Sequence, residues 1–322
     1  MPGRARRSSC RFPTLGHMEL ALMTEPQLGG THDDLLAAAR WAEDHGFVSF
    51  ARSDHYDWGR DGDPNATDAF VSLGGLARET STIRLAVLVS PLTFRHPGVI
   101  AKSAATLDEM SGGRFDLGVG TGWHEDEHTL LGLAFPDWAE RFARLEEALP
   151  YLQQALRAEH ASFRGEYYSI DGVVRPLAPS VNLIVGGSGP TRTPRLAATW
   201  ADEYNTFFRS AEELDARISV VREQAERLGR DHILCSVMGP GLVGSDEADY
   251  RDRLARRAAE REMEPSELEE RLTSNGLPVG PVDRVAELLA GLEEVGVDRW
   301  YVQVIPHDGD TVAESAGPLL GL

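Results

Sequence analysis

The sequence predicts a closed barrel of eight parallel β-strands with a helix after each strand. Short apolar segments alternate with amphipathic helical patterns, and eight such units fit into about 300 residues. Two segments, RLAVLV at 84–89 and NLIV at 182–185, are apolar at nearly every position. Such segments are typical of strands buried on both faces of a parallel sheet. A doubly wound open sheet is the alternative architecture for the same alternation.

The strands are expected where short apolar runs occur, and the helices where apolar residues recur on one face. The expected strands are 19–24, 47–53, 84–89, 114–119, 182–185, 203–207, 233–238 and 299–304. The expected helices are 33–45, 68–79, 97–110, 141–157, 193–201, 212–228, 282–291 and 312–320. The first helix has an apolar face that includes Leu35, Ala39 and Trp41, and Gly46 follows its end, as is common for helices.

Two segments interrupt the alternation and predict insertions after the fourth and seventh strands. Residues 158–180 contain FRGEYYSIDG, which indicates a small hairpin with Asp171-Gly172 as its turn. Residues 246–278 are highly charged and helical in pattern. In a barrel we expect both insertions to lie on loops beside the active-site mouth.

Composition indicates a soluble protein with one domain over residues 18–322. The chain has 32 basic and 51 acidic residues, a net charge of −19, which argues against binding to nucleic acid or an anionic membrane surface. Cys10 and Cys235 form no metal or disulfide pattern, so we expect no metal site and a cytoplasmic location. Residues 1–17 are basic without an apolar segment. We expect them to be a disordered extension or the product of an upstream start site, with the fold beginning at Met18.

The stretch after the fourth strand is the richest in functional signals. The strand runs into Gly118, Gly120 and Gly122, and WHEDEH follows at 123–128. Glycine lets backbone approach a flat ligand closely, so this stretch predicts the lip of a binding site. The alternative is a glycine-rich turn followed by the solvated start of an acidic helix.

Two further motifs follow the second and third strands, where catalytic residues of a barrel lie. SDHYDW at 53–58 contains His55, and histidine is the side chain whose unperturbed pKa lies near neutrality, while the neighbouring Asp54 would hold its tautomer. The alternative is a loop aspartate capping the next turn beside a surface histidine. In VSPLTFRHP at 89–97, small and apolar residues would support one face of a planar ring. A plain turn before a helix that starts with Pro97 is the alternative there.

The fourth motif is IVGGSGPT at 184–191, after the fifth strand. Its glycines expose backbone N–H groups at the start of a helix, where the helix dipole favours phosphate. It matches neither the nucleotide-binding P-loop nor the dinucleotide pattern GxGxxG.

With these residues together, the chain resembles the luciferase-like monooxygenase family, and most closely its branch that uses the deazaflavin coenzyme F420. The matching segments include ARWAEDHGF leading to SDH, TIRLAVLVSPLTFRHPGVIAKSAATLDEMSGGRFDLGVGTGW, and VGGSGPTRTPRLAATWADEYN. The resemblance implies a barrel and a non-prolyl cis peptide near Leu88, Val89 and Ser90 that supports the cofactor ring. It places the cofactor phosphates at four residues: Gly186, Gly187, Ser188 and Gly189.

The resemblance also implies roles for other residues. His55 matches a histidine near the reactive carbon of the cofactor, with Asp54 beside it. Gly120, Trp123 and Asp126 would contact the cofactor, and Trp58 and Trp123 would wall the substrate pocket. Trp123 stands where sugar-phosphate dehydrogenases of the family have a glutamate, which puts a sugar phosphate in doubt as substrate. The nearby Glu125, Asp126 and Glu127 receive no proton-transfer role from the match.

The expected function is transfer of a hydride between a small organic substrate and F420, the protein supplying orientation and electrostatics. One alternative is an FMN-dependent monooxygenase that uses oxygen and receives reduced flavin from a partner reductase. An alternative of another class is a non-catalytic flavin-binding barrel. Relatives suggest a homodimer.

Overall fold

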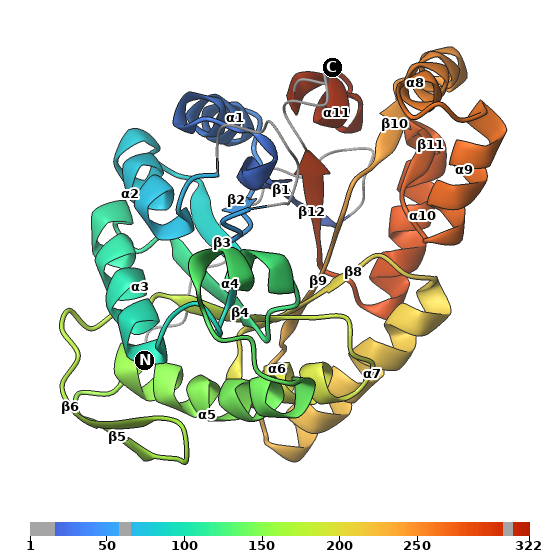
Figure 1. Cartoon of the computed structure of the whole chain (residues 1–322). Helices are drawn as coiled ribbons and strands as arrows, with labels where there is room; N and C mark the ends of the chain where they lie inside the picture. Colours follow the sequence, from blue (N-terminus) through green and yellow to red (C-terminus); the bar gives the residue numbers. More distant parts are fainter. Residues whose placement is uncertain (1–16, 58–65, 305–311) are drawn as a thin grey trace.

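The protein forms a closed barrel of eight parallel strands, as the sequence predicted (Figure 1). The computed structural model describes residues 17–57, 66–304 and 312–322. Around the barrel the strand order is β1-β12-β9-β8-β7-β4-β3-β2. The strands are β1 (Glu19–Thr24), β2 (Ser49–Arg52), β3 (Arg84–Pro91), β4 (Phe115–Gly120), β7 (Asn182–Gly186), β8 (Glu203–Phe207), β9 (Leu234–Gly239) and β12 (Arg299–Val304). Closure excludes the open-sheet alternative.

Helices surround the barrel, most of them along its outer face, while α4 packs over its carboxyl end (Figure 1). They are α1 (His32–Asp44), α2 (Ala69–Glu79), α3 (Pro97–Ser111), α4 (Glu125–Leu131), α5 (Trp138–Arg157), α6 (Arg192–Trp200), α7 (Ala211–Arg227), α10 (Val282–Val295) and α11 (Val312–Ala316). Side-chain caps begin several of them. Thr31 and Asp34 form a reciprocal capping box on α1, and Asp68 caps α2 by accepting from the N–H of Val71. All eight expected helices are present within a few residues.

Small and apolar side chains fill the interior of the barrel. This interior cluster consists of Ala21, Met23, Ala51, Ala86, Leu88, Ile184, Met238 and Tyr301. A larger apolar layer packs between the outer face of the strands and the helices. The barrel is therefore a packed core, and ligands have room only at its ends.

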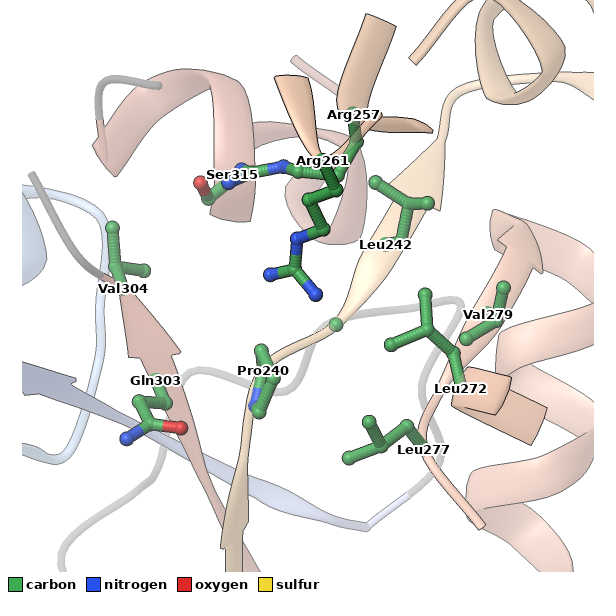
Figure 2. Close-up of a pocket in the computed structure, with 11 residues that line it drawn as sticks. Pro240, Leu242, Arg257, Arg261, Leu272, Leu277, Val279, Gln303, Val304 and Ser315 are labelled. Carbon is green, nitrogen blue, oxygen red and sulfur yellow. The ribbon is translucent and has the colours of Figure 1, made fainter. Parts of the chain in front are cut away.

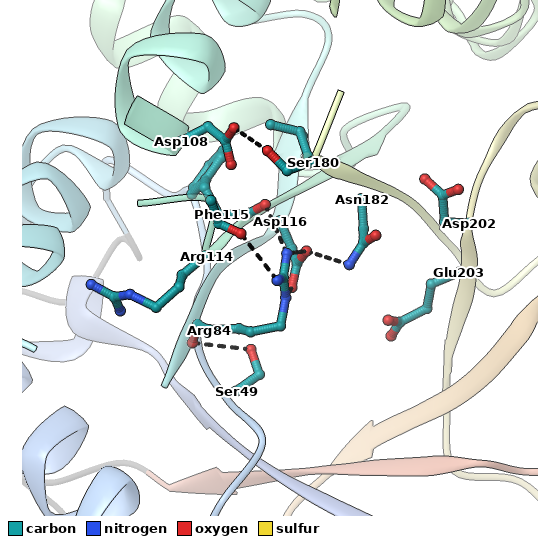
Figure 3. A network of polar contacts seen from close by, with 12 residues as sticks. Ser49, Arg84, Asp108, Arg114, Phe115, Asp116, Ser180, Asn182, Asp202 and Glu203 are labelled. Carbon is teal, nitrogen blue, oxygen red and sulfur yellow. Dashed lines mark hydrogen bonds and ion pairs between the residues drawn. The ribbon is translucent and has the colours of Figure 1, made fainter. Parts of the chain in front are cut away.

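Paired charges occupy the amino-terminal end of the barrel. Arg84 donates from Nε to Asp116 Oδ2 at 2.8 Å, and Asn182 Nδ2 donates to Asp116 Oδ1 at 2.7 Å (Figure 3). Nearby, Arg299 Nη1 donates to Glu203 Oε2 at 2.7 Å. These five side chains come from the first or second residue of their strands, so they satisfy one another at that end. The carboxyl end is left for a functional site.

The first insertion forms the predicted hairpin, but its turn was predicted wrongly. The strands are β5 (Ala161–Arg164) and β6 (Ser169–Gly172), so the turn is at 165–168. Asp171 pairs with Ser162 inside the second strand. The carboxylate of Glu147 on α5 accepts N–H bonds from three successive turn residues, Glu166, Tyr167 and Tyr168. This tertiary contact outweighs the local preference of Asp-Gly for a turn. The hairpin follows α5 and packs on it, so it does not lie directly after a strand end as expected.

The second insertion lies between β9 and α10, at the carboxyl end of the barrel, as predicted. It consists of the strand β10 (Leu242–Gly244), the helices α8 (Glu247–Glu260) and α9 (Pro265–Ser274), and the strand β11 (Val279–Pro281). β10 and β11 pair in parallel, and α8 and α9 lie next to them (Figure 1). Throughout the described ranges, no helix has the length and apolar character to cross a membrane.

Candidate active site

The end of β3 has the backbone geometry that the resemblance implied. The peptide bond between Leu88 and Val89 is cis, although neither residue is proline. Val89 is half-buried and its side chain lies against the glycines of two neighbouring strands. A Cβ added to Gly120 would lie 2.9 Å from Val89 Cγ2, and one added to Gly186 would lie 2.7 Å from Val89 Cγ1. These two glycines therefore make room for Val89, a task that the sequence analysis did not assign to them.

His55 follows β2 and is bonded to a carboxylate from a distant part of the chain. Its Nδ1 lies 2.9 Å from Oε1 of Glu127, on α4. The other oxygen of Glu127 accepts the backbone N–H of Tyr56 at 3.0 Å. The Glu127 side chain is 1% exposed and that of His55 is 14% exposed. Both carboxylate oxygens are thus committed, and they fix the position of the imidazole from one side.

This pairing sets the charge state of His55. Burial lowers the pKa of the imidazole, but the hydrogen bond and charge of Glu127, with smaller effects of Glu25 and Asp54, outweigh it. The net result is a pKa raised above the ordinary value of 6.5. His55 consequently keeps a proton to higher pH than a free histidine, and the carboxylate beside it makes it a candidate general acid or base.

Asp54 has a different set of partners from the one that the sequence suggested. Its carboxylate accepts from Ser90 Oγ at 2.7 Å and pairs with Arg95, which also pairs with Asp68. Arg95 lies over the ring of Phe70, 4.9 Å from its centroid. Asp54 is fully buried. It therefore ties β2 to the end of β3, while Glu127 takes the orienting position beside His55.

Two of the residues predicted to contact the cofactor follow β4, and they lie in different surroundings. Trp123 is 59% exposed, and its ring packs edge-on against His55 with the centroids 5.6 Å apart. Asp126, by contrast, is exposed on α4, one residue before the buried Glu127. Trp58 lies outside the described residues. The structure therefore brings Trp123 to His55 and leaves Asp126 on the outer face of its helix.

The glycine loop at 186–189 leads into the start of α6, as predicted. The N–H of Gly187 is already used, since it donates to the carbonyl of Asn205 at 3.1 Å. Within the described chain, the N–H groups of Ser188 and Gly189 have no acceptor, and the side chain of Thr191 does not cap α6. The donors available to a phosphate are therefore those of Ser188, Gly189 and the first turn of α6.

A third buried carboxylate, besides Glu127 and Asp54, lies at the same end of the barrel. Glu25, directly after β1, accepts from Gln27 Nε2 at 2.6 Å and from Gln303 Nε2 at 2.7 Å. Gln27 in turn accepts from Ser53 Oγ at 2.7 Å. Neither Glu25 nor Glu127 was identified as functional from the sequence. For Glu127 the sequence offered only its place in an acidic helix start after the fourth strand, and nothing there distinguished it from Glu125 and Asp126.

Comparisons with known proteins agree with this architecture. The family model described as luciferase-like monooxygenase matches residues 16–299. The chain belongs to the luciferase-like monooxygenase family. A relative from Nakamurella multipartita, named F420-dependent glucose-6-phosphate dehydrogenase, is 41% identical over 196 residues, which is 59% of this chain. The match spans 57% of that relative, so this chain corresponds to little more than half of its length.

Two solved structures share the fold along almost the whole chain. The coenzyme F420-dependent tetrahydromethanopterin reductase of Methanopyrus kandleri has a TM-score of 0.73 at 20% identity, covering 95% of this chain and 97% of its own. The EDTA monooxygenase of Chelativorans sp. has a TM-score of 0.77 at 16% identity, covering 94% and 93%. At these identities the likeness establishes the barrel architecture alone.

Proposed function

We propose that the protein is an F420-dependent oxidoreductase acting on a small organic substrate. The observation that carries this proposal is the buried His55–Glu127 pair at the carboxyl end of the barrel, beside the exposed ring of Trp123. A histidine held by a carboxylate handles one proton, which is what oxidation of an alcohol or reduction of a carbonyl requires besides a hydride. The similarity to F420-dependent dehydrogenases supports the same cofactor.

The residues present at the mouth fit a phosphorylated ring cofactor. Ser188 and Gly189 offer N–H donors beside the uncapped start of α6, as a phosphate requires. Leu88, Val89 and Ser90 would lie along the ring, with Trp123 at its edge. When bound, the deazaflavin would supply the chemistry of a hydride donor or acceptor at its C5.

The His55–Glu127 pair would hold and move the proton. Glu127 accepts at Nδ1, so the proton exchanged with substrate would be that on Nε2. The carboxylate stabilises the imidazolium whenever His55 takes a proton, and it keeps the neutral ring in the tautomer protonated at Nδ1. Asp54 and Arg95 are positioning residues, since they join the strand end that carries His55 to the strand end at Ser90.

The substrate named for the relatives, glucose 6-phosphate, cannot be assigned directly to this protein. Trp123 has no titratable proton, so it cannot take the part of a glutamate at that position. Proton handling would therefore fall to His55, and we propose a substrate other than a sugar phosphate. FMN and a flavin reductase partner belong to the rival function, in which the barrel serves an oxygenase.

Equilibrium titration of the purified protein with F420 and with FMN, followed by fluorescence, tests the proposal. We expect F420 to bind at least about tenfold more tightly, a difference of ~1.4 kcal/mol. The variant Glu125→Gln, which changes an exposed charge on α4, should bind both cofactors as the wild type does. Tighter binding of FMN would overturn the assignment.

A further inference from the structure

A cavity lies at the carboxyl end of the barrel, on the side of β9 and β12, away from the glycine loop. It opens between the ends of these strands, the second insertion and α11 (Figure 2). Pro240 and Gln303 form its floor in this view, and Ser315 borders it above. The cavity is thus on the same end of the barrel as His55, but neither the cofactor proposal nor the His55–Glu127 pair uses it.

One wall of the cavity is apolar. Leu242, Leu272, Leu277 and Val279, all from the second insertion, line it (Figure 2). Leu242, Leu272 and Leu277 are only partly buried, and they pack on the small apolar core of the insertion. Aliphatic surface left partly open at the side of a barrel mouth favours an apolar ligand body.

The wall formed by the end of α8 carries a cation, Arg261, that has no partner among the residues described by the structure. The neighbouring α8 arginines are paired: Arg251 with Glu247, Arg253 with Asp249 and Arg257 with Glu260. The side chain of Arg261 makes no hydrogen bond or ion pair with any residue that the structure describes. Its guanidinium points into the cavity (Figure 2). The chain has 51 acidic and 32 basic residues, so most arginines have carboxylates available as partners. A guanidinium that instead points into a cavity favours binding of an anionic ligand there.

Polar contacts connect the cavity with the candidate active site. Gln303 borders the cavity and donates to Glu25 at 2.7 Å. Glu25 is close enough to His55 for its charge to act on the imidazole. Gln303 and Glu25 therefore link the cavity to the end of the barrel where His55 lies.

We propose that this cavity binds the anionic end of an amphipathic organic acid, with Arg261 holding the carboxylate and the insertion leucines contacting the chain. The inference rests on the proposed function, because it makes this acid the substrate that His55 protonates or deprotonates. The apolar wall distinguishes such a substrate from a sugar phosphate, whose hydroxyl groups would lose water without gaining partners there.

The test is a binding measurement without cofactor, by calorimetry, on the full chain. Octanoate is the probe, with 1-octanol and glucose 6-phosphate as comparison ligands. We expect octanoate to bind more tightly than either. Arg261→Gln should raise the Kd for octanoate at least about tenfold and leave that for 1-octanol unchanged. Arg251→Gln, on α8 but outside the cavity, is the matched control and should bind octanoate as the wild type does.

Two results would overturn the inference. The first is an unchanged Kd for octanoate in Arg261→Gln, and the second is tighter binding of glucose 6-phosphate than of octanoate. A separate F420 titration of the same variant shows whether the cavity holds the cofactor instead. If Arg261→Gln weakens F420 binding, the cavity belongs to the cofactor. If the wild type binds octanoate but not F420, the proposed function fails while the anion site stands.

Discussion

Replacing Glu127 with glutamine probes the proposed proton chemistry most sharply, because the change is nearly isosteric. The carboxylate accepts from His55 at 2.9 Å and from Tyr56 at 3.0 Å. A glutamine has only one acceptor oxygen, so it can accept only one of these two hydrogen bonds. If the oxygen stays with Tyr56, the NH₂ group faces Nδ1 of His55. The ring must then turn to the tautomer protonated at Nε2.

The expected cost follows from burial. Glu127 is 1% exposed, so the charge-assisted bond is not weakened by water. Such bonds contribute about 1.5–3 kcal/mol. Losing this stabilisation in the transition state lowers turnover roughly 10- to 100-fold. The pKa of His55 should also fall, because a charge that raises it is removed. The pH profile of activity should therefore shift to lower pH.

Nuclear magnetic resonance of the His55 ring nitrogens, titrated against pH, measures the tautomer and the pKa of His55 directly. Glu125→Gln removes an exposed charge from the same helix turn and should leave the tautomer and titration of His55 unchanged. A Glu127→Gln protein with the wild-type His55 titration would refute the argument, because it would show that Glu127 does not set the protonation of His55.

Other substitutions give distinct outcomes. His55→Ala should lower turnover about 10²- to 10⁴-fold while cofactor affinity, measured by fluorescence titration, falls much less; equal losses in both would indicate a structural role. Gly187→Val should weaken F420 binding at least about tenfold, ~1.4 kcal/mol, since even a Cβ there lies 3.2 Å from buried Thr193. An unaltered Kd would place the phosphate elsewhere. Gly118→Ala puts a Cβ 2.3 Å from the Val87 carbonyl and should cost about 1–3 kcal/mol in urea unfolding. Gly291→Ala, in open helix surface, should instead add about 0.4–1 kcal/mol; the reverse order would contradict the packing argument.

The barrel was predictable because its signals are local. Each apolar run of four to eight residues is bounded by helix starts and stops, and burial on both faces leaves little ambiguity. The hairpin turn was not predictable in this way. Asp171-Gly172 carries the stronger local preference, but Glu147 holds the backbone of Glu166–Tyr168 from a neighbouring helix. The residues near the turn do not reveal that Glu147 binds this backbone, so the position of the turn could not be predicted from them.

The partner of His55 shows the same limit at the site. Asp54 is adjacent in sequence, but successive side chains of extended backbone point to opposite sides. Asp54 accordingly pairs with Arg95, while His55 meets Glu127, which is 72 residues away. A helical reading of 125–131 predicts that only some of its acids face inward. It does not predict which one, because that depends on how α4 docks on the barrel.

The central claim is that the protein transfers a hydride between an organic substrate and F420 with His55 handling the proton. Reduction of the bound cofactor by candidate substrates tests it most directly. The protein loaded with F420 is mixed with a panel of alcohols and carboxylic acids while cofactor absorbance and dissolved oxygen are recorded together. Our account predicts that at least one compound changes the F420 absorbance without oxygen uptake, and that His55→Ala abolishes most of this change. Oxygen uptake that requires reduced FMN, with no response of F420 to any compound, would contradict it.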